Sequence, residues 1–265
     1  MSRFAGRRAL VTGASRGIGA AIAERLAAEG ADVAITARTA EEHPKLPGSL
    51  RETAGRMAEH GGKVVTVVAD LADEEDRARI VPEAEAGLGE PVDILVNNAA
   101  AAIYQPLADY PLRRRRVIFE VNVHAPTDLA QAVVPAMVEQ GRGWIVNLSS
   151  ATARAPKGPP FRETVLSTTT AVYGASKAAL NRLTVALAAE LGDTGVRVNT
   201  VEPRAAVLSE GAEVHIGGKL PDEAFETMEE MVEATVALCD CPAERTGGLH
   251  VSLDLIEELG LTVEG

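Results

Sequence analysis

The chain has 265 residues, of which 46% are hydrophobic and 24% are charged, and its formal net charge at pH 7 is −12. This composition excludes extensive disorder and is typical of one folded domain with a sizeable core, so we expect residues 1–265 to form a single domain. The acidic balance and the 3% of aromatic residues disfavour binding to double-stranded or single-stranded nucleic acid.

Short apolar runs rich in Val, Ile and Leu alternate with longer amphipathic stretches along the chain. The apolar runs, which read as strands buried on both faces, are 9–11, 33–37, 64–69, 92–97, 144–148, 196–201 and 249–253. The amphipathic stretches, which predict helices, are 18–29, 50–60, 73–86, 112–140, 175–191 and 222–238. Several of these helices are expected to end at a glycine, at 30, 61, 87, 141 and 192. The alternation predicts an α/β fold, a doubly wound parallel sheet with helices on both faces.

A glycine-rich turn separates the first predicted strand from the first predicted helix. Its three glycines follow a G-x-x-x-G-x-G spacing, which permits positive φ angles and a close approach of a ligand to the backbone. The helix that follows presents free N–H groups and the positive end of its dipole, which suits a pyrophosphate. The sequence therefore predicts a dinucleotide phosphate site, with these candidate residues: Gly13, Ser15, Arg16, Gly17, Ile18 and Gly19.

The end of the second predicted strand bears on the choice of cofactor. An NAD site usually places an acidic residue there to bind the ribose 2′-hydroxyl, whereas this strand ends at Ala37-Arg38 with no acid. The guanidinium groups of Arg38 and Arg16 can form charge-assisted hydrogen bonds with a 2′-phosphate. The sequence therefore favours NADP(H), with NAD(H) as the alternative and two solvated surface arginines as the plain explanation.

A second group of residues suggests acid–base chemistry. Tyr173 and Lys177 are four residues apart and so share one face of a helix. An ammonium beside a phenol stabilises the phenolate, so we expect the pKa of Tyr173 to fall from about 10 toward neutrality, where the phenol acts as a general acid/base. Ser150 follows the fifth predicted strand and offers a hydroxyl to a substrate oxygen. Asn122 is a poor helix former inside a predicted helix, which suggests a polar role, or else an exposed side chain.

Together these motifs resemble those of the short-chain dehydrogenase/reductase family, in the order that the family has them. The residues that carry the resemblance are Thr12–Gly19, Asn97-Asn98-Ala99, Asn122, Ser150, Tyr173-x-x-x-Lys177 and Asn199-x-x-x-Pro203. The loop 39–49 further resembles the hydroxysteroid dehydrogenase-like proteins and related bacterial enzymes. The resemblance implies a Rossmann-type sheet of seven parallel strands and the interconversion of a carbonyl and a secondary alcohol by hydride transfer.

The resemblance also implies a role for each site residue. Tyr173 would exchange a proton with the substrate oxygen, and Lys177 would bind the nicotinamide ribose and lower the Tyr173 pKa. Ser150, in preference to Ser149, would hold the substrate oxygen, while Asn122 would hold a water that links Lys177 to solvent. Asp70 would contact the adenine. The other implied cofactor contacts are Leu71, Asn98, Ala99, Ala100, Tyr173, Lys177 and Pro203.

The sequence departs from the family pattern in three places. Ala100 replaces a glycine after the Asn-Asn-Ala motif, and Arg204 replaces a glycine after Pro203. Leu208 stands where a threonine often binds the carboxamide, and Ser209 is a candidate substitute. Ser150 and Tyr173 are 23 positions apart, about ten more than usual, so we expect residues 151–171 to form a wall of the substrate pocket, with Phe161 and Arg162 in it.

Several expectations concern partners, location and alternatives. We expect a small carbonyl or alcohol substrate, apolar in character, a pocket capped by residues 204–222, and a homo-oligomer, a tetramer or dimer, formed through the helices at 112–140 and 175–191. The absence of a long apolar stretch or a signal core, and the close pair Cys239 and Cys241, favour a cytoplasmic protein with reduced thiols and no metal or membrane span. The run 113–116 reads as a solvated helix face or subunit contact.

The alternative functions are a non-catalytic NADP-binding regulator or scaffold, an enoyl reductase, and a dehydratase.

Overall fold

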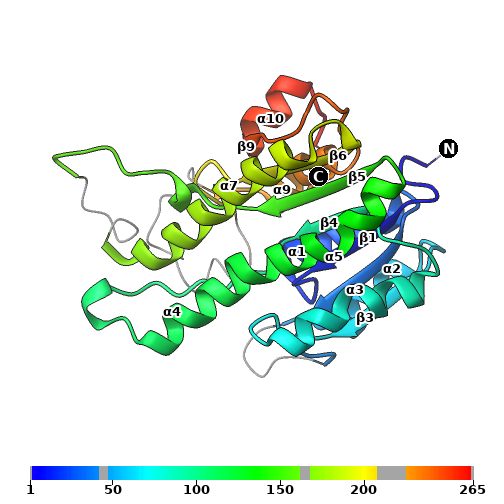
Figure 1. The fold of residues 1–265 in the computed structure, drawn as a ribbon, viewed down its shortest axis with the longest axis horizontal. Coiled ribbons are helices and arrows are strands. Elements are labelled where there is room, and N and C mark those ends of the chain that lie inside the picture. The colour runs from blue at the N-terminus through cyan, green and yellow to red at the C-terminus, as the bar shows by residue number, and fades with distance from the viewer. Residues whose placement is uncertain (1, 42–46, 162–167, 208–224, 264–265) are drawn as a thin grey trace.

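The computed structural model describes residues 2–41, 47–161, 168–207 and 225–263. Seven parallel strands form its central sheet in the order β3-β2-β1-β4-β5-β6-β9 (Figure 1). Their bounds are β1 Arg8–Thr12, β2 Asp32–Ala37, β3 Val64–Val68, β4 Ile94–Asn97, β5 Gly143–Leu148, β6 Val196–Glu202 and β9 Leu249–Val251. The strand order reverses between β1 and β4, so the crevice for a ligand lies at the carboxyl ends of the strands there.

Helices cover both faces of this sheet, because side chains alternate between two hydrophobic cores along each strand. In β1, for example, Ala9 and Val11 belong to one core and Leu10 to the other. The first core includes residues of α1 (Gly17–Ala28), α2 (Leu50–Ala58), α9 (Met228–Leu238) and α10 (Ser252–Leu259). The second includes residues of α3 (Glu74–Leu88), α5 (Ala125–Glu139) and α7 (Ala171–Leu191). The fold class predicted from the sequence is thus confirmed.

Some elements differ from the prediction. The last strand ends at Val251 and α10 begins at Ser252, whose buried hydroxyl donates to the Glu226 carboxylate. Helix α3 runs through Gly87 and ends at Leu88, and Gly89, which has a positive φ of +89°, caps it. The sequence reading also missed a short two-stranded sheet formed by β7 (Ala206–Val207) and β8 (Phe225–Glu226). Among the described residues, no helix combines the length and apolar character needed to cross a bilayer.

The long predicted helix at 112–140 consists of three parts. Helix α4 (Leu112–Phe119) leads into a π-helical segment, Glu120–His124, and then into α5. Because Pro126 has no backbone N–H, it cannot close the α-helical hydrogen bond to the carbonyl of Asn122. Segments of π-helix occur often at functional sites, and this one sets Asn122 apart within an otherwise regular helix.

Candidate active site

The glycine-rich turn after β1 has the geometry of an anion site. Gly13 and Gly17 have φ angles of +68° and +54°, in the left-handed region that favours glycine. Helix α1 begins at Gly17 with no side-chain cap and no acidic residue in its first turn, and Ser15 and Arg16 precede it. The N–H groups at this helix end, with the positive end of the helix dipole, therefore face outward for an anion such as a pyrophosphate.

Gly19 allows this turn to lie close to the loop after β4. The Asn98 Nδ2 donates to the carbonyls of Thr12 (2.8 Å) and Gly13 (3.2 Å), which ties the two loops together. A Cβ at Gly19 would lie 2.2 Å from the Asn98 Nδ2 and 2.6 Å from the Gly13 oxygen. Ala99 completes the tie, as its N–H donates to the Thr12 hydroxyl at 3.1 Å. Asn98 thus holds the phosphate turn in shape, and the cradle fits a dinucleotide.

The residues expected at the adenosine end lie beside this turn. The Arg16 Nη2 donates to the Gly48 carbonyl at 3.4 Å, so the loop after β2 folds against the phosphate turn. Arg38 is exposed at the end of β2. Asp70 accepts the N–H of Ala72 at 3.0 Å. Next to Asp70, Leu71 is buried. Of the loop that resembles hydroxysteroid dehydrogenase-like proteins, residues 42–46 lie outside the described part of the chain.

Tyr173, Lys177 and Ser150 come together at the carboxyl end of β5. Tyr173 and Lys177 lie one turn apart on α7, and both are buried. Ser150 lies close enough to the Tyr173 phenol to lower its pKa, and the Ser150 Oγ is 2.9 Å from the Thr152 Oγ1. The Lys177 Nζ donates to the Leu148 carbonyl at 2.6 Å. The Ser149 hydroxyl instead donates to Asn181, at 2.5 Å. The structure therefore places Ser150, and not Ser149, beside Tyr173.

The electrostatics of this group differ from the expected direction. Burial raises the pKa of Tyr173, the neighbouring Tyr104 adds to the rise, and the Ser150 hydrogen bond lowers it only in part. Burial also lowers the pKa of Lys177 to about 8. The expectation of a Tyr173 pKa near neutrality is therefore wrong for this structure, because the loss of hydration on burial is the largest influence on the phenol. At neutral pH the phenol carries its proton.

The lowered pKa of Lys177 predicts a pH-dependent stability. Below pH 8 the ammonium is charged in both states, and the folded protein bears the full cost of burying it. Between about 8 and 10.5 the folded state has released the proton while the unfolded state keeps it, so stability rises with pH. We expect the difference in unfolding free energy between the wild type and Lys177→Met to change by about 2 kcal/mol in favour of the wild type as the pH rises from about 7.5 to 9.5.

Denaturant unfolding of both proteins across this pH range measures the gain. Lys63→Met is the matched control, because the Lys63 ammonium also donates to a backbone carbonyl, that of Leu88 (2.8 Å), but is exposed. Its difference from the wild type should stay constant with pH. If the difference in unfolding free energy between the wild type and Lys177→Met also stayed constant with pH, the lowered pKa of Lys177 would be contradicted.

Asn122 is buried, so the alternative explanation of this residue, an exposed side chain, is wrong. Its Oδ1 accepts the N–H of Ala101 at 2.8 Å, and its Nδ2 donates to the Ser176 hydroxyl at 3.0 Å. Ser176 in turn donates to the Tyr173 carbonyl at 2.7 Å. Asn122 thus joins the loop that follows Asn98 and Ala99 to the first turn of α7.

Two residues of the site were missed by the sequence reading. The Tyr104 ring packs edge-on against Tyr173, with centroids 5.4 Å apart and planes at 74°. Arg154 pairs with the buried Glu202 (Nε–Oε1 3.0 Å) and donates to the carbonyls of Pro203 (3.3 Å) and Arg204 (2.5 Å). Arg154 therefore fastens the segment after Ser150 to the loop after β6. Nothing in the local sequence signals either contact, because both join distant segments.

The remaining predicted features are placed only in part. Residues 154–161 extend away from the body of the fold (Figure 1), and Phe161 is 59% exposed, while Arg162 lies outside the described residues. That this segment walls the pocket stays a prediction. Ala100 is exposed beside the crevice. Arg204 donates its N–H to Glu226 and pairs with Asp254 at 2.5 Å. Of the expected cap at 204–222, the structure describes only residues 204–207. The candidates Leu208 and Ser209 lie outside the described residues.

Comparison with known proteins identifies the family of this chain. A sequence model of the short chain dehydrogenase family matches residues 7–213. Hydroxysteroid dehydrogenase-like protein 2 of Xenopus tropicalis is 30% identical over 259 residues, which cover 98% of this chain and 60% of that protein. L-Xylulose reductase of Bos taurus is 34% identical over 261 residues, 95% of this chain and 96% of that protein.

Solved structures extend the agreement to three dimensions. A metagenomic short-chain oxidoreductase in complex with NADP is 30% identical with a TM-score of 0.74, and the match covers 94% of this chain and 97% of that one. The present chain spans about 60% of the length of the hydroxysteroid dehydrogenase-like relatives. Since the family match covers most of the chain and includes the phosphate turn and the Ser150–Tyr173–Lys177 group, the chain belongs to the short-chain dehydrogenase/reductase family of oxidoreductases.

Proposed function

We propose that this protein is an NADP(H)-dependent oxidoreductase that interconverts a carbonyl and a secondary alcohol, with Tyr173 as the general acid/base. The observation that carries the proposal is the meeting of Ser150, Tyr173 and Lys177 at the end of β5, beside the loop held by Asn98. These are the donors that a carbonyl oxygen needs as it gains negative charge.

Each side chain has a defined task in the reductive direction. The Tyr173 phenol is protonated at neutral pH and donates its proton to the substrate oxygen. Ser150 donates a second hydrogen bond to that oxygen, and Lys177 holds the ribose and supplies positive charge near the phenol. The bound nicotinamide supplies the hydride. Because Pro126 has no N–H, the backbone carbonyl of Asn122 has no α-helical hydrogen-bond donor. This carbonyl is suited to hold a water on the proton path to Lys177.

The test is the oxidation of NADPH, followed by absorbance, with a panel of ketones and of enoyl thioesters. Ketone-dependent turnover that is lost in Tyr173→Phe supports the proposal. Turnover with enoyl thioesters alone would instead identify an enoyl reductase, and cofactor binding without any turnover would identify a regulator. The ring of Tyr104 and the side chain of Ile103, which packs in an apolar cluster with Val172, favour ketones of apolar character.

Arg38 supports the preference for NADP(H). It is exposed at the end of β2, and within the described residues it has no carboxylate at ion-pair distance. We expect Arg38→Asp to raise the KM for NADPH about tenfold or more, since a charge-assisted bond to a phosphate is lost and a repulsion is added. The KM for NADH should fall in the same variant. Steady-state kinetics with both cofactors measure this, and an unchanged KM for NADPH would assign the 2′-phosphate to other residues.

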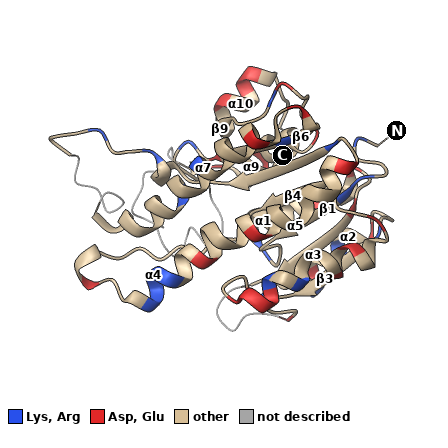
Figure 2. Ribbon diagram, in the orientation of Figure 1, with Lys and Arg blue, Asp and Glu red and all other residues tan. Residues whose placement is uncertain are grey.

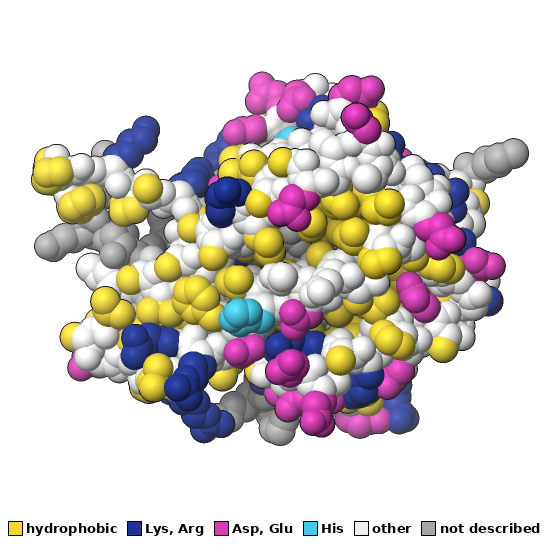
Figure 3. Space-filling model, in the orientation of Figure 1, with side chains coloured by type: hydrophobic (Ala, Val, Ile, Leu, Met, Phe, Trp, Pro, Cys, Tyr) yellow, Lys and Arg dark blue, Asp and Glu magenta, His cyan; other side chains and the backbone are white. Residues whose placement is uncertain are grey.

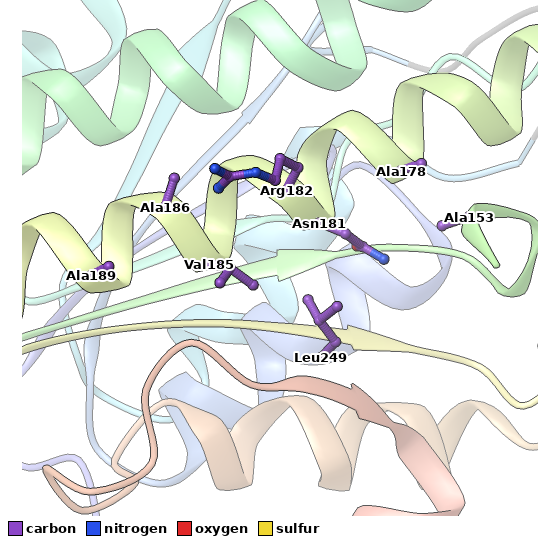
Figure 4. Close-up of a pocket in the computed structure, with 8 residues that line it drawn as sticks. All are labelled: Ala153, Ala178, Asn181, Arg182, Val185, Ala186, Ala189 and Leu249. Atoms are coloured by element: carbon purple, nitrogen blue, oxygen red, sulfur yellow. The ribbon is translucent and has the colours of Figure 1, made fainter. Parts of the chain in front are cut away.

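We further propose that the protein is a cytoplasmic homo-oligomer assembled through α5 and α7. Hydrophobic side chains gather on the face where these helices lie (Figure 3), and a groove of about 750 Å³ runs along α7 beside Leu249 (Figure 4). Val185 lines this groove and is 39% exposed. Helix α4, with its four arginines, forms a separate basic surface (Figure 2).

The oligomer predicts the behaviour of a charged variant. We expect Val185→Arg to lower the mass measured by light scattering to that of a smaller assembly, because a buried unpaired charge is costly at an interface. Leu107→Arg is the control, since Leu107 is 61% exposed on a short turn that belongs to neither α5 nor α7, and its replacement should leave the mass unchanged. A monomeric wild type would end this part of the proposal.

A further inference from the structure

A cluster of basic residues lies at the amino-terminal ends of the strands, opposite the active site. It consists of Arg7 and Arg197, which lie against Trp144, and of Arg8 and Arg142, which pair with the nearby Asp93. We call it the arginine–tryptophan cluster. Arg7 directly precedes β1, whereas Arg197 and Trp144 are the second residues of β6 and β5. Pro203 lies six positions after Arg197 along extended β6, a distance of about 20 Å. The strands in Figure 1 show these two opposite ends of the sheet.

The strand register brings Arg7 and Arg197 to the same face of the sheet as Trp144. Trp144 is opposite Arg197 in the pairing of β5 with β6, and Ala9, two residues after Arg7, belongs to the same core as Trp144. The Arg7 Cζ lies 4.4 Å and the Arg197 Cζ 5.0 Å from the centroid of the indole ring. Both guanidinium groups therefore pack against the ring, and the Arg197 Nη1 also donates to the Gly195 carbonyl.

The charges of this cluster are not balanced. Arg8 and Arg142 share one carboxylate, that of the buried Asp93, at 2.6 and 3.1 Å. Neither Arg7 nor Arg197 has a carboxylate at ion-pair distance within the described residues. The Arg7 Nη1 and the Arg197 Nε are buried without a hydrogen-bond partner. Burial and the charge of Arg142 lower the pKa of Arg7, the Asp93 carboxylate offsets part of this, and Arg8 and Arg197 add to the lowering.

An unbalanced group of four guanidinium groups is unexpected in a chain with a net charge of −12. Buried N–H donors without partners and like charges in close proximity are both costly, and an oxyanion would relieve both. Planar guanidinium forks match the oxygens of a phosphoryl group in particular. We propose that the arginine–tryptophan cluster is a binding site for a phosphoryl anion, distinct from the cofactor phosphate site at Gly13–Gly19.

The chain carries its own reporter for this site, because Trp144 is its single tryptophan. We expect inorganic phosphate and pyrophosphate to change the Trp144 fluorescence with a saturable response, while chloride at the same ionic strength does not. Saturating NADP⁺ should leave the phosphate midpoint unchanged, since the cofactor phosphates bind at the other end of the sheet. A response to pyrophosphate alone would assign the site to a diphosphoryl ligand, in support of the same chemistry.

Variants attribute the response to the two guanidinium groups. We expect Arg7→Gln and Arg197→Gln each to raise the phosphate midpoint about tenfold, the value of one charged hydrogen bond. Arg113→Gln, which removes the same charge from the exposed surface of α4, should not change it. Circular dichroism checks that the variants are folded. If a variant is not folded, the comparison of phosphate with chloride on the wild-type protein still tests the proposal. A response that chloride reproduces, that NADP⁺ abolishes, or that both folded variants retain would overturn the proposal.

Discussion

We expect Tyr173→Phe to lower kcat about a thousandfold and to leave the binding of NADPH in place. The variant removes only the phenolic oxygen, which is the proposed proton donor and lies close to Ser150. The aromatic ring, and with it the edge-on contact to Tyr104, remains. Without the donor, the alkoxide formed in reduction has no proton source of matched geometry, so the chemical step slows while the cofactor cradle is unchanged.

The kinetics of a second phenol serve as the control. Tyr110 is also buried, and its hydroxyl donates to the Ile103 carbonyl at 2.7 Å. Tyr110→Phe should cost about 1 kcal/mol of stability for the lost hydrogen bond and leave kcat within a few-fold of the wild type. Steady-state rates and an NADPH fluorescence titration on both variants measure the contrast. A Tyr173→Phe enzyme that keeps a tenth of the wild-type kcat would remove Tyr173 from the role of proton donor.

The sheet was predictable because its central strands are buried on both faces. Runs such as Val33–Ile35 and Trp144–Val146 are apolar at successive positions, and such runs are typical of a parallel sheet between two layers of helices. Helix α10 was not predicted, because its eight residues directly follow β9 with no break in the apolar pattern. The two-residue strands β7 and β8 are too short for any periodicity.

The site was predictable wherever its residues follow each other in a motif. The spacing of Tyr173 and Lys177 places both on one face of α7, as the helical period requires. The pKa of Tyr173 could not be read from this spacing, since it depends on burial by segments that are remote in sequence. The same holds for Arg154, whose partners at 202–204 lie about 50 positions away. Contacts between loops are set by the fold and leave no local pattern.

The second large effect concerns the turn that holds the cofactor. We expect Gly19→Ala to weaken NADPH binding by about a hundredfold or more, because the new methyl group would lie 2.2 Å from the Asn98 Nδ2 and 2.6 Å from the Gly13 oxygen. Either Asn98 leaves the Thr12 and Gly13 carbonyls or the turn moves outward. In both cases the N–H groups at the start of α1 lose the arrangement that fits a pyrophosphate.

Gly55→Ala separates this effect from the general consequence of replacing a helical glycine. Gly55 is exposed in α2, and an added Cβ there would meet no atom within 4 Å. Gly55→Ala should therefore raise the unfolding free energy by up to about 1 kcal/mol and leave NADPH binding unchanged. Gly19→Ala should instead lower the unfolding free energy, by about 1–3 kcal/mol, through the same overpacking that disturbs binding. Equal NADPH affinity in the two variants would show that the close approach of Asn98 to α1 has no part in holding the cofactor.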